Sequence, residues 1–321
     1  MAIRTQVAHR SDVKFSGKDE KLPDPHCRKY HFVMRRARLI ISDLDNTIYN
    51  WVDGYIPCLR RIIHTAALEL NTTPSQITQE LKTIFSAHSS IEFAFSAFLR
   101  VPGFSALETD RLLRLISTLC EQYLRAEKTY LKAYPTVKQT LRWAMENRIP
   151  VIGITNAPLV CAARRLRVLG IEHLFRGLIG WEGPSGVERE HEILRSPPST
   201  SRSTWYHTVS TQHLKPNPYS YRVVQEKFNL RAEECVAIGD SLEKDIRPAL
   251  ELGMTGVWAE YGRECSSPNM KFLLSVTPWT EARIKAEYST ASQLRSFNAA
   301  RFQDLRNHLA PLQQPLPIYE P

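Results

Sequence analysis

The sequence has no apolar run long enough to cross a membrane, and its amino terminus is unlike a secretory signal. A membrane-spanning helix needs about 20 mainly apolar residues, and no window of this chain approaches that length. Arginine and histidine come before any apolar segment at the amino terminus, whereas a signal peptide has an early apolar region. We therefore expect a cytoplasmic protein that has no membrane partner.

The sequence also lacks an internal repeat and a Cys-x-x-Cys pair, the spacing found in many zinc and redox sites. Its cysteines are far apart and lie mostly in segments with a helix-like or strand-like pattern: Cys27, Cys58, Cys120, Cys161, Cys235 and Cys265. We interpret them as reduced, buried thiols. This interpretation fits a reducing compartment.

The chain has enough apolar side chains for a folded core. Of its 321 residues, 43% are apolar and 23% are charged, which is typical of a globular protein and excludes a disordered or fibrous one. The formal net charge of +9 favours an anionic partner, and phosphorylated metabolites satisfy it as readily as nucleic acid. Much of the excess positive charge lies in residues 1–37, which we interpret as a basic, irregular extension.

An apolar segment at residues 39–41 leads directly into two acids, Asp43 and Asp45. The pattern predicts a buried strand, and strand alternation places both carboxylates on the same side. Two neighbouring carboxylates repel each other unless a cation or a shared proton relieves the repulsion, and such costly pairs are typical of functional sites. The alternative is a loop in which Asp45 and Thr47 only cap a turn.

Further apolar strands are predicted near 151–156, 179, 235–239 and 255–258, and helical patterns lie between them. This alternation predicts an α/β fold with a parallel sheet and helices on both faces. Ligands of such folds bind at the carboxyl ends of the strands. Polar residues stand at two of these ends: Thr155, Asn156 and Asp240.

After a turn-like passage over residues 48–54, helical periodicity begins at about Ile56, and residues 52–133 are predicted to form a small all-helical unit. Irregular composition marks three other segments. The predicted organisation is an extension (1–37), a catalytic core (38–51 and 134–261), a helical cap (52–133), a surface insertion (183–204) and a tail with a Pro-rich end (262–321).

Four sequence motifs in fixed order resemble those of the haloacid dehalogenase-like hydrolase superfamily. They are the run Asp43-Leu44-Asp45-Asn46-Thr47, Thr155 after a strand, Lys215 before a helix, and the run from Gly239-Asp240 to Asp245. The resemblance implies a Rossmann-like, doubly wound parallel sheet with an all-helical cap inserted between the first two motifs. Within the superfamily, the chain looks similar to phosphoglycolate phosphatase and pyrimidine 5′-nucleotidase members.

The chemistry of phosphoryl transfer assigns a role to each motif. Asp43 is the predicted nucleophile, which forms an aspartyl-phosphate. Asp45 is the predicted acid and base, which protonates the leaving oxygen and then activates water. Thr155 and Lys215 are predicted to bind the transferring phosphoryl group, and Asn156 to assist them.

Crowded carboxylates also need a cation, and hard oxygen ligands favour Mg²⁺. The resemblance implies that Asp43, the backbone carbonyl of Asp45, and Asp240 hold the metal. Asp245 is a further candidate, which either assists the metal through water or orients Lys215.

The superfamily leaves the substrate open. True dehalogenases lack the second acid, so Asp45 favours phosphate esters; a sugar phosphomutase or a non-catalytic phosphate-binding protein are the alternatives. We expect a small phosphorylated metabolite rather than nucleic acid as the partner, and a monomer or homodimer. Since a cap closes over the leaving group, polar cap residues are predicted to contact the substrate: His88, Ser89, Glu92 and Arg100.

Overall fold

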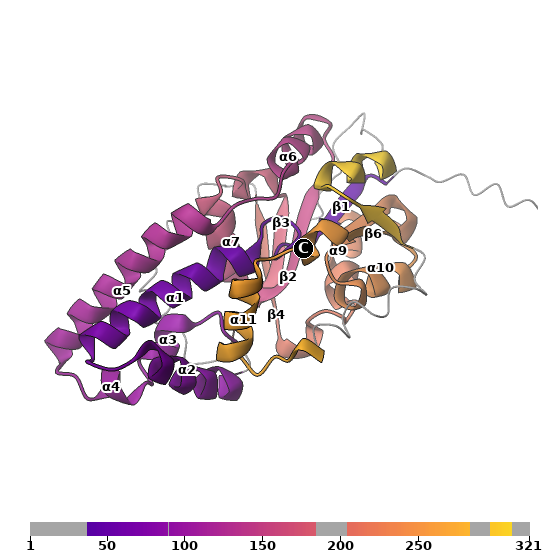
Figure 1. Cartoon of the computed structure of the whole chain (residues 1–321). Helices are drawn as coiled ribbons and strands as arrows, with labels where there is room; N and C mark the ends of the chain where they lie inside the picture. The colour runs from indigo at the N-terminus through magenta and orange to yellow at the C-terminus, as the bar shows by residue number, and fades with distance from the viewer. Residues whose placement is uncertain (1–36, 89, 184–203, 283–295, 310–321) are drawn as a thin grey trace, which may run out of the picture. The chain divides into compact units, whose positions relative to one another are not determined.

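The computed structural model describes residues 37–88, 90–183, 204–282 and 296–309, which belong to one compact unit. Within these residues, seven strands form one parallel sheet in the order β4-β3-β2-β1-β5-β6-β7 (Figure 1). The strands are β1 (Leu39–Ser42), β2 (Val151–Pro158), β3 (Gly177–Trp181), β4 (Trp205–Val209), β5 (Cys235–Gly239), β6 (Thr255–Ala259) and β7 (Phe297–Ala299). The predicted α/β fold class is therefore confirmed.

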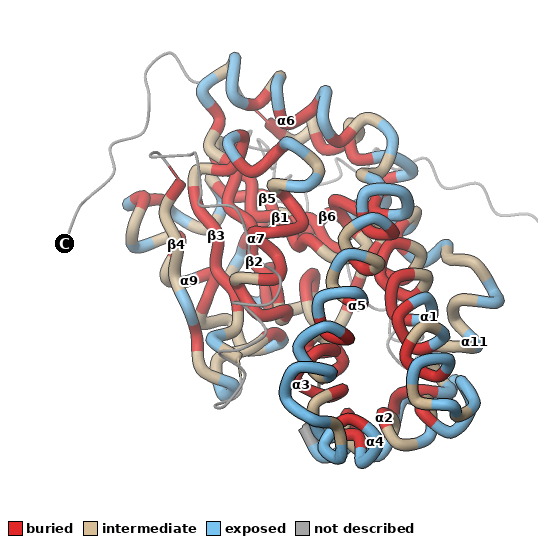
Figure 2. The backbone as a smooth tube through the Cα atoms, turned by 90° about the vertical axis from the view of Figure 1, so that its left-hand side faces the viewer, coloured by how far each residue is buried: buried red, intermediate tan, exposed pale blue. Residues whose placement is uncertain are grey.

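The apolar strands are buried on both faces, as a parallel sheet covered by helices requires. Ile40 of β1 packs in the same cluster as α6 and α7, whereas Leu39 and Ile41 point to the other face and pack with α9 and α10. Figure 2 shows that the strands are mostly buried. The four helices are α6 (Val137–Glu146), α7 (Leu159–Val168), α9 (Tyr219–Phe228) and α10 (Arg247–Glu251).

Between β1 and α6, the elements of the described residues are all helices, in the segment where the sequence predicts the cap. They are α1 (Trp51–Glu69), α2 (Pro74–His88), α3 (Ala94–Phe98), α4 (Pro102–Ser105) and α5 (Thr109–Tyr130). Buried aromatic rings fill their centre, including Phe85, Phe95 and Phe98. The sequence predicted a turn before Ile56, but α1 already begins at Trp51, because the Asn50 side chain accepts a hydrogen bond from the Asp53 amide and caps the helix. The exact boundary of the cap stays a prediction.

The segment after residue 261 is more ordered than the sequence predicted. Helix α11 (Ser267–Val276) contacts α1 and α2, and the Asp53 side chain of α1 accepts hydrogen bonds from the Ser266 amide (3.0 Å) and from Asn269 (2.8 Å). Strand β7 then extends the sheet, and the helical turns of η7 (Phe302–His308) bury Phe302. As far as residue 309, the predicted tail is therefore part of the fold, and the Pro-rich end lies outside the described residues.

Both strands at the edges of the sheet were absent from the prediction. Strand β7 has only three residues, which is too short to show periodicity. Strand β4 is mostly half-buried and carries aromatic residues on an edge position, so it lacks the continuous apolar pattern of the inner strands.

Several other predictions can be followed only in part. Residues 1–36 of the basic extension and 184–203 of the insertion lie outside the described residues. The five described cysteines form no disulfide, and Cys27 is not described. Among the described residues, no helix is both long and apolar enough to pass through a bilayer.

Candidate active site

Asp43 directly follows β1, at the carboxyl end of the central strand. Its amide donates to the Ile238 carbonyl of β5 (2.9 Å), so the backbone is still held by the sheet. Its side chain is nearly buried, with one carboxylate oxygen 2.5 Å from the Lys215 ammonium. The other oxygen, Oδ2, has no hydrogen-bond partner among the described residues. Asp43 therefore keeps one oxygen free of protein donors.

Lys215 joins three elements of the site. Its Nζ contacts Asp43 Oδ1, donates to Asp245 Oδ1 at 2.6 Å and to the Ile154 carbonyl at 3.2 Å. Burial alone would lower the pKa of Lys215, but Asp245 and Asp43 raise it well above its usual value. The side chain therefore stays a charged ammonium.

Asn156 of strand β2 holds the backbone of Lys215. Its side-chain amide donates to the Lys215 carbonyl (2.8 Å) and accepts from the Lys215 amide (2.8 Å). Both ends of the amide are thus used within the protein. The structure thus adds a contact that the sequence did not predict, between the Asn156 side chain and the Lys215 backbone, and the predicted assistance of Asn156 to phosphoryl binding stays a prediction.

Thr155 faces Asp45. Its hydroxyl donates to Asp45 Oδ2 (3.2 Å) and accepts from the Ala157 amide (3.0 Å), and the residue is buried. The structure thus places the threonine of β2 beside Asp45, the second acid of the first motif.

Three carboxylates meet at the end of β5. Oxygens of Asp43, Asp240 and Asp245 all lie within 4.8 Å of one another. Burial raises the pKa of Asp43 to about 7, although Lys215 opposes the shift; Asp245 and Asp45 add to it. Burial also raises the pKa of Asp240 well above its usual value, and repulsion from Asp43 contributes. Such a cluster of hard oxygen atoms could hold a divalent cation.

Asp245 uses both oxygens within the protein: Oδ1 accepts from Lys215 and Oδ2 accepts from the Ser241 amide at 3.0 Å. Of the two roles that the sequence left open, these contacts are those of a residue that orients Lys215. Gly239 makes room for it, because a Cβ at this position would lie 2.4 Å from the Asp245 side chain.

Arg165 connects Asp45 to Glu92. Arg165 of α7 donates to Asp45 Oδ1 (3.2 Å), and its second amino group pairs with Glu92 of the segment between α2 and α3. Burial would lower the pKa of Arg165, but Glu92 and Asp45 raise it well above its usual value. No role for Arg165 was predicted from the sequence. A charged residue on the buried face of α7, beside Ala162 and Leu166, was the available signal.

Of the four residues that the sequence predicted for substrate contact in the cap, the structure places one beside the acids of the site. Glu92 lies next to Arg165, and its side chain is only 10% exposed. Arg100 is exposed, the His88 side chain is not described, and Ser89 lies outside the described residues. The cap also meets the core at the ring contact between Phe93 and Trp181 (6.2 Å between centroids).

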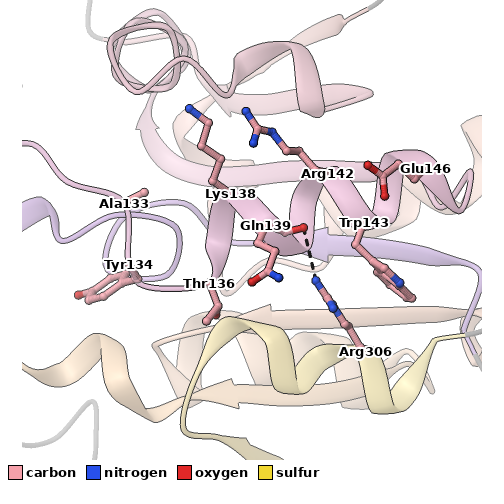
Figure 3. A pocket seen from close by; sticks show the side chains of 9 residues that line it. All are labelled: Ala133, Tyr134, Thr136, Lys138, Gln139, Arg142, Trp143, Glu146 and Arg306. Carbon is pink, nitrogen blue, oxygen red and sulfur yellow. Dashed lines mark hydrogen bonds between the residues drawn. The ribbon is translucent and has the colours of Figure 1, made fainter.

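A groove of about 620 Å³ follows α6, and none of the acids described above lines it. Its walls include Trp143 and the Arg306 guanidinium, which stacks on the indole ring at 4.9 Å. Figure 3 shows Lys138 and Arg142 extending away from Arg306, so the positive charges of the groove do not converge on one point.

The parallel sheet carries the Asp43 carboxylate, the buried Lys215 and an acidic cluster at the carboxyl ends of its central strands, which is the arrangement that the sequence predicted for a hydrolase of the α/β class. A family model described as haloacid dehalogenase-like hydrolase matches residues 37–253. The chain therefore belongs to the haloacid dehalogenase-like hydrolases, and the predicted family is confirmed.

Individual relatives agree with this assignment. The chain is 39% identical to a glyceraldehyde 3-phosphate phosphatase of Pyrococcus furiosus over 237 residues, which cover 72% of this chain and 83% of the relative. It is 24% identical to a phosphoglycolate phosphatase of Pseudomonas fluorescens, over 74% of each chain. The fold is similar to that of a 2-haloacid dehalogenase of Pseudomonas syringae pv. tomato, with a TM-score of 0.51, 17% identity, and coverage of 84% of this chain and 97% of the other.

Proposed function

We propose that this protein is a magnesium-dependent phosphatase, which hydrolyses a small phosphate monoester through an aspartyl-phosphate on Asp43. The contact that carries the proposal is the Lys215 ammonium 2.5 Å from the Asp43 carboxylate. A buried ammonium beside a nucleophile attracts the phosphate dianion and stabilises the charge that develops in phosphoryl transfer. The printed names of the two phosphatase relatives support the same activity.

In the first half-reaction, a carboxylate oxygen of Asp43 bonds to phosphorus as the bond from phosphorus to the leaving oxygen breaks. Asp45 gives its proton to that oxygen, so an alcohol leaves and Asp45 becomes a carboxylate. Thr155 of β2 donates a hydrogen bond to Asp45 and so helps to hold its carboxylate in place. Lys215 neutralises charge on the transferring group and on Asp43.

In the second half-reaction, the Asp45 carboxylate takes a proton from water as the water oxygen bonds to phosphorus. The bond from phosphorus to Asp43 breaks, which releases inorganic phosphate and restores the Asp43 carboxylate. Asp45 is protonated again for the next turnover. The two half-reactions thus use one residue first as acid and then as base.

The residues present fit a Mg²⁺ ion. The Asp43 and Asp240 carboxylates and the Asp45 backbone carbonyl are hard oxygen donors, and Asp43 Oδ2 is buried with no hydrogen bond among the described residues. Asp245 completes the acidic cluster but is occupied by Lys215 and Ser241. When bound, the cation offsets the negative charge of the phosphoryl group and of the crowded acids.

The substrate is proposed as a small phosphorylated metabolite with a sugar or organic-acid leaving group, and a nucleoside monophosphate is a further candidate. The names of the relatives favour the first class. Glu92 of the cap is proposed to face the leaving group from the Asp45 side, since Arg165 links the two acids.

The test is release of inorganic phosphate from a panel that contains 4-nitrophenyl phosphate, phosphoglycolate, glyceraldehyde 3-phosphate, hexose phosphates and nucleoside monophosphates. The proposal expects turnover that requires Mg²⁺ and that falls by at least 10³-fold in Asp43→Asn, in line with the loss of a nucleophile. Conversion of a hexose phosphate to its isomer without net phosphate release would instead indicate a phosphomutase. Binding without any turnover would indicate a phosphate-binding protein.

A further inference from the structure

Two adjacent arginines of α7 are buried against the cap. Arg164 pairs with Glu127 of α5 through both amino groups, at 2.6 Å for the contact of Nη2 with Oε1. Arg165 pairs with Glu92 through one amino group only. Both arginines are 2–3% exposed and neighbour each other on α7, so the two arginines are matched in burial, charge and place in the fold.

Only Arg165 of the two also reaches the catalytic core, where its Nη1 donates to Asp45 Oδ1 at 3.2 Å. A guanidinium is a rigid plane that presents donors at fixed angles, so one group can hold two acids in a set relation. Thr155 donates to the other oxygen of Asp45. The Asp45 carboxylate is therefore fixed at both oxygens, once from β2 and once through α7.

We infer that Arg165 is a positioning residue for Asp45, and that Glu92 makes this positioning depend on the cap. The inference rests on the proposed role of Asp45 as general acid. In this inference, Arg165 affects the reaction only by holding the Asp45 carboxylate in place. Glu92 holds the second amino group, so the guanidinium keeps its orientation toward Asp45 while the cap segment carrying Glu92 is in place.

A comparison of substrates with different leaving groups distinguishes a positioning role of Arg165 from a purely structural one. An alkyl alcohol is a poor leaving group and needs the proton from Asp45, whereas 4-nitrophenolate leaves with little help from an acid. The value of kcat/KM reports steps up to departure of the leaving group. A misplaced Asp45 should therefore lower kcat/KM for an alkyl phosphate much more than for 4-nitrophenyl phosphate.

The experiment compares Arg165→Lys with Arg164→Lys, since both variants keep the charge and lose the planar fork. For each, the ratio of kcat/KM for the best alkyl phosphate to that for 4-nitrophenyl phosphate is measured. This ratio does not depend on the fraction of enzyme that is folded. We expect Arg165→Lys to lower it about 10- to 100-fold, as a misplaced catalytic group does, and Arg164→Lys to leave it within about twofold.

Two more variants complete the design. Glu92→Gln keeps the shape of the side chain and loses its charge, and it is expected to lower the same ratio by a smaller factor. Asp45→Asn is the reference and should lower the ratio by at least about 100-fold, the contribution of a general acid. An unchanged ratio in Arg165→Lys, with a lowered ratio in Asp45→Asn, would overturn the positioning role alone. An unchanged ratio in Asp45→Asn would overturn the general-acid role in the proposed function.

Discussion

Replacing Lys215 with methionine should destabilise the protein strongly, because it removes the buried cation that contacts two of the clustered acids. Lys215 is within 2.6 Å of both Asp43 and Asp245, and the three side chains are between 2% and 9% exposed. Methionine has a similar length and keeps the apolar contacts of the stem. The variant therefore isolates the loss of the charge.

The size of the expected loss in stability follows from the burial of Lys215 and its acidic partners. Unit charges about 4 Å apart near a protein surface interact by roughly 4 kcal/mol, and removal of one partner from a buried ion pair costs about 3–5 kcal/mol in mutational studies. We expect Lys215→Met to lower the free energy of unfolding by about 3–5 kcal/mol at pH 8 without metal. Arg125→Met, which removes an exposed pair with Glu121, should change it by at most about 1 kcal/mol.

The loss should shrink at low pH. Asp43 has a pKa of about 7 in the folded protein and 3.8 ordinarily, and Lys215 opposes that rise. Without Lys215 the pKa of Asp43 lies higher still, so at pH 5 the folded variant holds the proton and avoids an unpaired carboxylate.

The assay is urea unfolding of wild type, Lys215→Met and Arg125→Met in EDTA at pH 5 and pH 8. A loss below about 1 kcal/mol at pH 8, or a larger loss at pH 5 than at pH 8, would refute the reasoning.

Three further predictions concern the metal, Gly262, which packs closely against Asn46 and Asp240, and Asn156, which holds the Lys215 backbone. In EDTA, the free energy of unfolding of the wild type should fall by at most about 4 kcal/mol as the pH rises from about 4 through 7, because the raised pKa of Asp43 means that the folded state holds its proton more tightly than the unfolded state. Mg²⁺ should then raise Tm more at pH 8 than at pH 5. An equal rise at the two pH values would contradict this. Gly262→Ala should lower the free energy of unfolding in urea by about 1–3 kcal/mol and weaken activity, since its Cβ would lie 1.9 Å from the Asn46 carbonyl oxygen. In the comparison variant Gly170→Ala, the new Cβ meets no atom within 4 Å, so this variant tests only the effect of a positive φ. Asn156→Leu should lower kcat at least about 10-fold by releasing the Lys215 backbone, with KM for phosphate esters changing less; a change in KM alone would instead support direct substrate contact.

The sequence predicted the central part of the fold because that part depends on local patterns. The apolar run before Asp43 and the one before Asp240 each specify a buried parallel strand, and a strand end fixes where the next side chain points. The helices between residues 52 and 133 were predicted in the same way, from the helical periodicity of their apolar residues. The short edge strand β7 and the half-buried strand β4 carry no such pattern, so they depend on tertiary pairing.

The arrangement of the site was predictable in part. The motif residues Asp43, Lys215 and Asp245 come together at the carboxyl ends of the central strands of the sheet. The contacts of Arg165 were not predictable, because its partners Asp45 and Glu92 are 120 and 73 residues away in the chain. The use of the Asn156 amide on the Lys215 backbone was missed for the same reason, since a side chain that binds a distant backbone leaves no spacing signal.

The most direct test of the central claim is to trap the covalent intermediate. Enzyme with Mg²⁺ is mixed with a phosphate ester labelled on phosphorus, quenched in acid within one turnover, digested and mapped by mass spectrometry. The account predicts label on the peptide that contains Asp43, lost on treatment with hydroxylamine as an acyl-phosphate is, and absent in Asp43→Asn. Turnover with no labelled peptide at any quench time, or label on a different residue, would contradict it.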